Sequence, residues 1–456
     1  MLKRTIEQEL LAWKNDKSHK ALLLTGPRQI GKTYIARKFA RENYENFVEL
    51  NFIINESAKA IFDNVSDVDM IITNLTAFTG KKCVPGKTLI FLDEIQDCPN
   101  ARTAIKFLVD DGRFDYIESG SLLGVKYKEV KSYPVGYEKV LEMYPLTFKE
   151  FLYANGIGEE VIEYLRKSYE NKTPVSDSIH QTMIKLFQYY MIVGGMPDVV
   201  QRFVDSHDIG QVIEIQKSIL ELYRQDISKY ALNDKAKIKE IFDSIPEELN
   251  AKNKRFILSK LSKSARMERY ENSFLWLRDA GVALPCYNID EPVIPLKINE
   301  KHNLFKLYMA DTGLLCAASF ENVQFEILNG NLDVNMGSIM ENIFAQILTA
   351  NGFNLRYFDK KGKCELDFVV QKGSEVCPLE IKSGNSYKLH PALSYALENK
   401  SWNISRAYVF CKGNIEEDNN IVYLPWYMSM FFKRDAIEKG HIVDVDLSGL
   451  DGLMNL

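Results

Sequence analysis

Apolar runs alternate with amphipathic segments over the first 120 residues. Residues 21–24 and 88–92 are apolar enough for buried strands, residues 47–52 alternate as a half-buried strand does, and residues 116–121 begin as a further strand. Between and around these strands, apolar residues recur at helical spacing in residues 2–13, 34–40, 58–62, 69–78 and 100–110. This alternation predicts an α/β fold, a P-loop NTPase doubly wound parallel sheet, with its ligand site at the carboxyl ends of the strands.

The loop after the first strand has the spacing G-x-x-x-x-G-K-[ST], which is typical of a phosphate-binding loop between a strand and a helix. Its glycines let backbone N–H groups face a phosphate, and the helix start adds partial positive charge. Lys32 is expected to reach the β- and γ-phosphates, and the Thr33 hydroxyl to bind Mg²⁺. The predicted nucleotide-binding residues here are Gly26, Pro27, Arg28, Gln29, Ile30, Gly31, Lys32, Thr33 and Tyr34.

Two acidic residues, Asp93 and Glu94, follow the strand at 88–92, about sixty residues after the loop. Asp93 is suited to hold Mg²⁺, and Glu94 is suited to act as the general base that polarises a water molecule. The following strand ends in Ser119 and Ser121, which would lie near the γ-phosphate or would instead cap a helix. The sequence therefore predicts catalytic Lys32 and Glu94, with Asp93 and Ser119 in the nucleotide site.

The middle of the chain is mainly helical. Residues 137–200 and 218–230 show helical patterns, with a Pro-Leu-Thr start at 145–147 that predicts a helix cap. Three further helical stretches within 236–280 precede an expected hairpin of residues 282–287 and 293–298, a winged-helix order. A dense basic patch in 252–269 would contact nucleic-acid phosphates or form a solvated helix face; its members are Lys252, Lys254, Arg255, Lys260, Lys263, Arg266 and Arg269.

The last part of the chain carries a second group of charged residues. Asp367 precedes Glu380 and Lys382 in the spacing D-x₁₂-E-x-K, on two expected strands joined by a turn at Gly373. Two carboxylates can bind Mg²⁺ and a lysine can polarise a phosphodiester, which is metal-assisted hydrolysis. Glu341, on the expected helix 337–350, is a further candidate metal ligand. The alternative is a hairpin held by salt bridges.

Composition narrows the class of protein. The chain has 456 residues, a net charge of -5 and 46% hydrophobic residues, which is ordinary for a globular protein of several domains. Seven scattered cysteines without a C-x-x-C pattern argue against a disulfide framework or a zinc site. The sequence shows no secretory signal and no membrane-spanning run, so we expect a cytoplasmic protein. The six histidines show no ligand spacing.

Several motifs together resemble a known family, the prokaryotic AAA-type ATPases in which a winged-helix region and a C-terminal domain of unknown function follow the ATPase. Beyond the motifs above, the resemblance rests on residues 144–148, 194–197 and 305–315. It implies ATP binding and hydrolysis, and a C-terminal domain similar to PD-(D/E)xK nucleases. Many members of that family carry a basic residue where this chain has Tyr137, so Arg113 and Arg224 are other candidates for an arginine finger.

These observations predict four units: an ATPase core at 1–165, a helical lid at 166–232, a winged-helix-like region at 233–315 and a nuclease-like domain at 316–456. The expected function is an Mg²⁺-dependent ATPase whose nucleotide state controls the C-terminal module, acting on nucleic acid. The alternative is an ATP-dependent signalling or interaction switch with an inactive C-terminal domain. An oligomer is compatible with the sequence.

Overall fold

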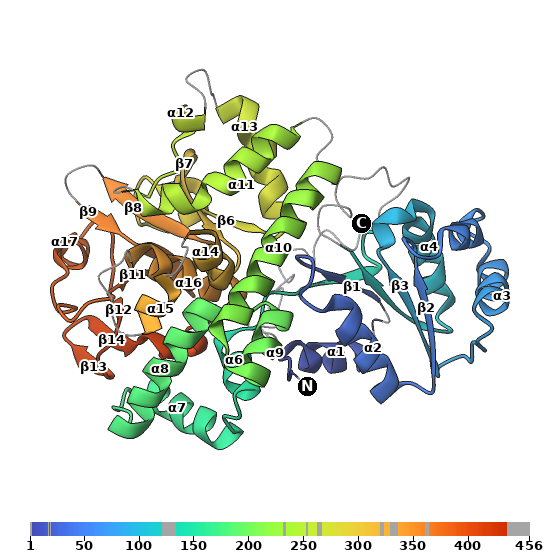
Figure 1. The fold of residues 1–456 in the computed structure, drawn as a ribbon, viewed down its shortest axis with the longest axis horizontal. Helices are drawn as coiled ribbons and strands as arrows, with labels where there is room; N and C mark the ends of the chain where they lie inside the picture. The colour runs from blue at the N-terminus through green and yellow to red at the C-terminus, as the bar shows by residue number, and fades with distance from the viewer. Residues whose placement is uncertain are drawn as a thin grey trace, which may run out of the picture.

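A computed structural model describes residues 2–16, 18, 20–120, 134–230, 234–251, 254–261, 267–319, 323–328, 336–360 and 364–435. Three sheets organise these residues, and Figure 1 shows the first on one side of the long helix α10 and the other two on the opposite side. Ser121, Lys252, Lys263 and Arg266 lie outside the described residues.

The first sheet has five parallel strands in the order β2-β3-β4-β1-β5, which confirms the predicted P-loop NTPase fold. Its strands are β1 (Ala21–Thr25), β2 (Asn46–Asn51), β3 (Thr88–Asp93), β4 (Asp115–Ser119) and β5 (Glu138–Glu142). Its helices and 3-10 turns are α1 (Ile6–Lys14), α2 (Lys32–Asn43), η1 (Glu56–Phe62), α3 (Val68–Thr79), η2 (Ile95–Asp97) and α4 (Pro99–Asp111). The register sets Asn51 opposite Asp93, and Leu24 opposite Ser119, so these strand ends meet at one edge.

One element of this sheet was predicted wrongly. Residues 138–142 form the edge strand β5, parallel to β1, whereas the sequence pattern indicated a helix. Only Leu141 of this strand is buried, and Val140 is 59% exposed, because an edge strand covers little of the core. With so few buried positions, the hydrophobic residues show neither the period of a strand nor that of a helix.

Helices form the middle of the molecule. They are α6 (Phe148–Ala154), α7 (Glu159–Asn171), α8 (Asp177–Val193), α9 (Pro197–Ser206), α10 (Ile209–Tyr230), α11 (Lys235–Asn250), α12 (Leu258–Leu261) and α13 (Met267–Asp279). The predicted cap of α6 is confirmed: Thr147 and Glu150 form a reciprocal capping box, which satisfies two backbone donors at the helix start. In Figure 1, α10 runs along the boundary between the ATPase sheet and the rest of the chain.

The second sheet has the order β7-β6-β8-β9 and the third has the order β10-β11-β12-β14-β13. The hairpin strands β6 (Ala283–Ile289) and β7 (Glu300–Met309) are antiparallel, and β6 also pairs with β8 (Arg356–Lys360). The second arm of the hairpin therefore begins at Glu300 and not at the predicted Val293, since prolines 292 and 295 lack the N–H that a strand pair needs. The remaining elements are α14 (Thr312–Ser319), α15 (Val323–Leu328), α16 (Met336–Ala350), β9 (Cys364–Leu366), β10 (Phe368–Lys372), β11 (Glu375–Ile381), α17 (Pro391–Glu398), β12 (Ala407–Cys411), β13 (Glu416–Asp418), β14 (Ile421–Pro425) and η4 (Trp426–Phe431).

A continuous hydrophobic core joins the ATPase sheet, the helices in the middle of the chain and the C-terminal elements. It extends from one face of the ATPase sheet through α8 and α10 to α16 and η4, while a separate core covers the other face of that sheet. Within it, the buried Asp311 carboxylate accepts the N–H of Gly195 at 2.6 Å and the N–H of Leu314 at 3.0 Å. These two hydrogen bonds hold the Gly-Gly turn before α9 against the start of α14.

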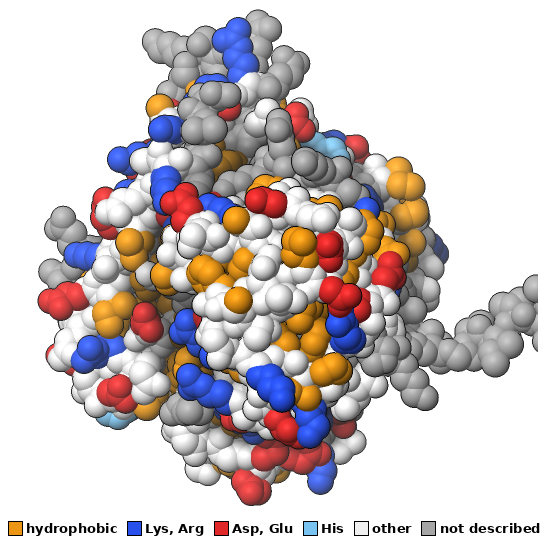
Figure 2. Space-filling model, turned by 90° about the vertical axis from the view of Figure 1, so that its right-hand side faces the viewer, with side chains coloured by type: hydrophobic (Ala, Val, Ile, Leu, Met, Phe, Trp, Pro, Cys, Tyr) orange, Lys and Arg blue, Asp and Glu red, His pale blue; other side chains and the backbone are white. Residues whose placement is uncertain are grey.

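The described surface has no strong segregation of charge on the side where β2 and α3 lie. Figure 2 looks onto this side, and basic, acidic and hydrophobic side chains are intermixed there. Within the described ranges, no helix is both long and apolar enough to pass through a bilayer.

Candidate nucleotide site and the C-terminal carboxylates

The phosphate loop connects β1 to α2 at the carboxyl edge of the first sheet. Gly26 has φ of 134° and Gly31 has φ of 88°, a region that favours glycine. A Cβ atom on Gly26 would lie 2.3 Å from the carbonyl oxygen of Met143, so this position requires glycine on steric grounds as well. The loop therefore has the tight backbone that the G-x-x-x-x-G-K-[ST] pattern predicts.

Lys32 is buried at the start of α2 and points back over the loop. Its Nζ donates to the carbonyl oxygens of Gly26 at 2.9 Å and Pro27 at 2.7 Å. Burial lowers the pKa of Lys32 to about 8, although the carboxylates of Glu94 and Asp93 oppose that change. An anion bound in the loop would favour the protonated lysine.

Asp93 lies at the centre of the polar contacts at this edge. Its carboxylate accepts the Thr33 hydroxyl at 3.0 Å and the Asn51 side-chain amide at 2.9 Å, and it also accepts the Ser119 hydroxyl. The structure thus brings together Thr33, Asp93 and Ser119, as the sequence predicts. Asn51 was missed, and its signal was its position as the last residue of β2, beside the strand that ends in Asp93.

Glu94 lines the same cavity as the phosphate loop. Its backbone is in the left-handed region, with φ of 56°, directly after the end of β3. The Gln96 amide donates to its carboxylate. The cavity has a volume of about 790 Å³, and its wall includes Lys32, Thr33, the N-terminal Leu2 and Arg4, and Pro197 of α9. A pocket of this size can hold a small phosphorylated ligand.

The loop also contacts the helical and hairpin parts of the chain. Arg28 forms an ion pair with Asp226 of α10, and its carbonyl oxygen accepts the Tyr223 hydroxyl at 3.3 Å. Pro27 packs against Gly281 so closely that a Cβ there would lie 2.9 Å from the proline ring. These contacts were not expected from the sequence, because the partners lie about two hundred residues from the loop or more.

The two arginines proposed as arginine-finger candidates do not line the nucleotide cavity. Arg113 pairs with Asp111 and Asp69, each at 2.7 Å, and precedes β4 at the amino end of the sheet. Arg224 pairs with Asp243 at 2.8 Å, between α10 and α11. Tyr137 directly precedes β5, and its carbonyl oxygen accepts the N–H of Ala21 at 2.9 Å.

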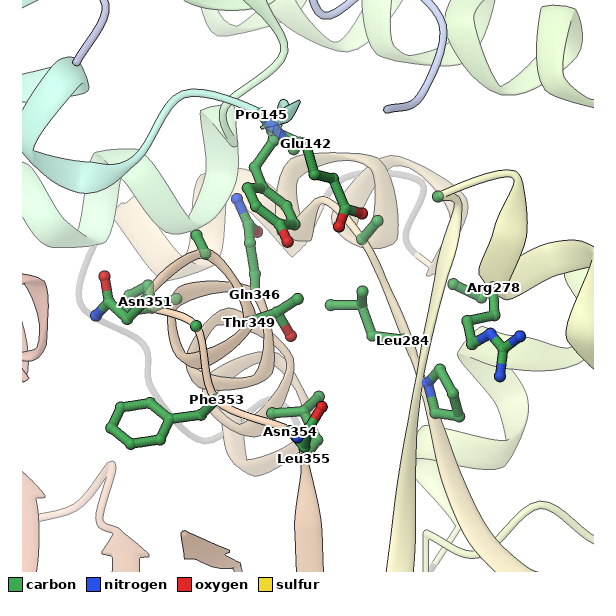
Figure 3. A pocket seen from close by; sticks show the side chains of 18 of the residues that line it. Glu142, Pro145, Arg278, Leu284, Gln346, Thr349, Asn351, Phe353, Asn354 and Leu355 are labelled. Atoms are coloured by element: carbon green, nitrogen blue, oxygen red, sulfur yellow. The ribbon is translucent and has the colours of Figure 1, made fainter. Parts of the chain in front are cut away.

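A second cavity of about 480 Å³ lies between the segment after β5, the β6–β7 hairpin and the end of α16. Figure 3 shows Thr349 on α16 facing Leu284 on the hairpin, with the Glu142 carboxylate directed toward the space between α16 and the hairpin. Pro27 also lines this cavity. The phosphate loop therefore borders both cavities.

The predicted C-terminal carboxylates lie near one another, in a strongly charged surrounding. Asp367 accepts the N–H of Ile381 at 2.8 Å, and Glu380 pairs with Lys382 at 2.8 Å. Burial, followed by the negative charges of Glu380 and Glu341, raises the pKa of Asp367 well above its usual range.

Glu341 is occupied by cationic and hydroxyl partners. It pairs with Lys254 and with Lys306, whose Nζ lies 3.2 Å away, and it accepts the Tyr308 hydroxyl at 2.8 Å. Within the described ranges, no group of three or more His, Cys, Asp or Glu side chains could hold a metal ion. Metal binding by Glu341, Asp367 and Glu380 therefore stays a prediction, and no chemical step below depends on it.

Much of the predicted basic patch faces acidic residues of the same chain. Lys254 pairs with Glu341, Arg255 pairs with Asp359, and Lys260 lies 2.8 Å from Glu248. These ion pairs leave less positive charge for nucleic acid than the sequence indicates, because each cation already has a carboxylate partner.

Comparison with known families agrees with this description of the N-terminal unit. Residues 18–152 match the family described as AAA domain. Residues 184–324 match a domain of unknown function (DUF8612), and residues 336–428 match another (DUF4143). No curated protein matches the chain. Sheet order, phosphate loop and family match identify the N-terminal unit as an AAA-type P-loop ATPase domain, which confirms that part of the resemblance.

Solved structures give weaker likenesses. The RuvB Holliday junction branch migration motor of Thermotoga maritima is 14% identical, with 62% of this chain and 89% of that chain covered and a TM-score of 0.29. The ORC1 protein of Aeropyrum pernix in complex with DNA is 13% identical, with 74% and 94% covered and a TM-score of 0.25. TM-scores this low carry no functional argument.

Proposed function

We propose that the N-terminal unit binds ATP with Mg²⁺ and hydrolyses ATP to ADP and phosphate. The observation that carries this proposal is the convergence of Lys32, Thr33, Asp93 and Glu94 on one edge of the sheet. Thr33 and Asp93 offer oxygen atoms 3.0 Å apart, the ligand type that Mg²⁺ prefers, and phosphate oxygens would complete its coordination. When bound, the ion neutralises charge that develops on the phosphates.

The protein residues have distinct roles in this reaction. Backbone N–H groups of the loop hold the β-phosphate, and Lys32 exchanges its carbonyl partners for phosphate oxygens. Glu94 accepts a proton from the water whose oxygen bonds to the γ-phosphorus, while the bond from that phosphorus to the bridging oxygen breaks and ADP leaves. Ser119 and Asn51 hold the Asp93 carboxylate through hydrogen bonds and so orient it.

Substitution of Glu94 tests the hydrolysis proposal. We expect Glu94→Gln to bind ATP as wild type does and to release phosphate at least about 100 times more slowly, since general-base catalysis supplies a factor of this order. Glu45→Gln, on the exposed surface and paired with Lys87, is the matched control. Equal turnover by wild type and Glu94→Gln would remove the base assignment.

We further infer that the nucleotide state influences the C-terminal part, which resembles a nuclease. The contacts of Pro27 with Gly281 and of Arg28 with Asp226, together with the continuous core, support such coupling. The paired positions of Asp367, Glu380 and Lys382 support a phosphodiester substrate. The test is Mg²⁺- or Mn²⁺-dependent cleavage of DNA and RNA, with and without ATP, by wild type and Asp367→Ala.

The occupation of Glu341 by Lys254, Lys306 and Tyr308 favours a second candidate, a nucleotide-dependent interaction switch with an inactive C-terminal domain. Lysine ammonium groups at this carboxylate compete with any cation that it would otherwise bind. Cleavage that is lost in Asp367→Ala would exclude the switch. ATP turnover without any cleavage would support it.

A further inference from the structure

Arg28 holds a particular place among the residues of the nucleotide cavity. It is the third residue of the phosphate loop, and it lines the same cavity as Lys32, Thr33 and Glu94. Its guanidinium pairs with Asp226, and the two side chains are 32% and 22% exposed. Arg28 is therefore accessible to a ligand that enters this cavity, and its ion pair with Asp226 is only partly buried.

Arg28 lies close to the residues that would contact the outer phosphate, since it lines one cavity together with Lys32 and Glu94. After burial and the nearby carboxylates, the charge of Arg28 contributes to the pKa of Lys32, the residue that reaches the β- and γ-phosphates. Burial is the main cause that raises the pKa of Asp226, and Glu94 also contributes. The pair thus lies within range of both the phosphate-binding lysine and the proposed base.

A triphosphate would compete with Asp226 for the guanidinium. A terminal phosphate offers three oxygen acceptors and about two negative charges, and arginine binds such a group in a bidentate manner. A diphosphate lacks the group that lies nearest to Glu94, so the ion pair with Asp226 would persist.

We propose that Arg28 distinguishes a nucleoside triphosphate from a diphosphate by binding the γ-phosphate in place of Asp226. This proposal rests on nucleotide binding at the phosphate loop, as proposed above. Arg28 would supply its positive charge from within the same loop, whereas Arg113 and Arg224 do not line the nucleotide cavity of their own chain.

The exchange has a direct structural consequence for α10. With a diphosphate, Asp226 holds this helix to the loop, and with a triphosphate that ion pair is broken. Arg224, half a turn away, joins α10 to Asp243 of α11 through its 2.8 Å ion pair. The Tyr223 hydroxyl still contacts the Arg28 carbonyl, so α10 would shift about this contact and not detach.

The test measures binding of ATPγS and ADP, each with Mg²⁺, by calorimetry. We expect Arg28→Gln to weaken ATPγS binding about tenfold or more and to change ADP binding less than about twofold, in line with the loss of a charge-assisted hydrogen bond. We expect Asp226→Asn to strengthen ATPγS binding, and the double variant to behave as Arg28→Gln does. Arg113→Gln is the matched control, since it removes the same charge at the opposite end of the sheet.

Each other outcome has a defined meaning. Equal weakening of both nucleotides in Arg28→Gln would overturn the proposal, as would an Asp226→Asn effect that persists without Arg28. Wild-type protein that binds neither nucleotide would refute the proposed function itself, and so differs from a failure of Arg28 alone. Circular dichroism of each variant checks folding, and Asp226→Asn tests the exchange independently if Arg28→Gln does not fold.

Discussion

Nucleotide binding should weaken as the pH rises past the pKa of Lys32, which is about 8 in this fold. The cause is the burial of its ammonium group at the start of α2, where its partners are two backbone carbonyl oxygens. The neutral amine cannot neutralise a phosphate, so the site must take up a proton whenever it binds nucleotide above this pH.

The size of the effect follows from the pKa. Lys32 would carry its proton in roughly 90% of molecules at pH 7 and in roughly 10% at pH 9. If the bound form stays protonated, affinity falls roughly tenfold between these values. Terminal phosphates have a second pKa of about 6, so their own charge changes little over this range.

The stability of the free protein should change in the opposite direction. Because the folded-state pKa lies below the usual lysine value of about 10.4, the unfolded chain binds more protons between pH 8 and that value. The free energy of unfolding therefore rises with pH over this interval while nucleotide affinity falls. A general loss of structure at high pH would lower both.

Calorimetry of ADP binding at several pH values, in buffers of different ionisation enthalpy, gives the affinity and the proton uptake together. We expect about half a proton per nucleotide at pH 8, where half of the lysines are neutral. Lys32→Arg is the control, because arginine stays protonated throughout this range. Constant wild-type affinity from pH 7 to pH 9, or the same slope in Lys32→Arg, would refute the reasoning.

Two further predictions concern stability. Lys306→Met should lower the free energy of unfolding by about 3 kcal/mol, because it removes a fully buried partner of Glu341. The control, Lys301→Met on the same strand, should lower it by less than about 1 kcal/mol. Equal effects of the two substitutions in urea unfolding would contradict a role for burial. Gly26→Ala should lower the unfolding free energy by about 2 kcal/mol or more and abolish nucleotide binding, because its Cβ would lie 2.3 Å from the Met143 carbonyl oxygen. A wild-type melting temperature with intact nucleotide binding would contradict this prediction and show that the loop can move to accept a side chain.

The sequence predicted the ATPase sheet and most of its site. The residues concerned lie at the ends of strands or in the loop between β1 and α2, and parallel strands bring their carboxyl ends to one edge. Lys32, Thr33, Asp93 and Ser119 could thus be grouped before their distances were known. The edge strand β5 escaped prediction, since its single buried residue gives no period.

Partners far apart in the chain could not be read from the sequence. A basic stretch such as Lys254 and Arg255 has the same appearance whether it faces phosphates, solvent or buried carboxylates. Only packing of the hairpin and α16 showed that Lys254 and Lys306 both contact Glu341. Likewise, the sequence did not predict that the hairpin strand β6 pairs with β8, because the two strands are far apart in the chain.

The phosphate loop and the acidic strand end were evident from residue order, because their chemistry depends on short spacing and local backbone geometry. The contacts of the loop became visible only in the folded chain: Arg28 pairs with Asp226, and Pro27 packs against Gly281. Such contacts depend on how a continuous core orients helices and sheets, and no local pattern of residues specifies that orientation.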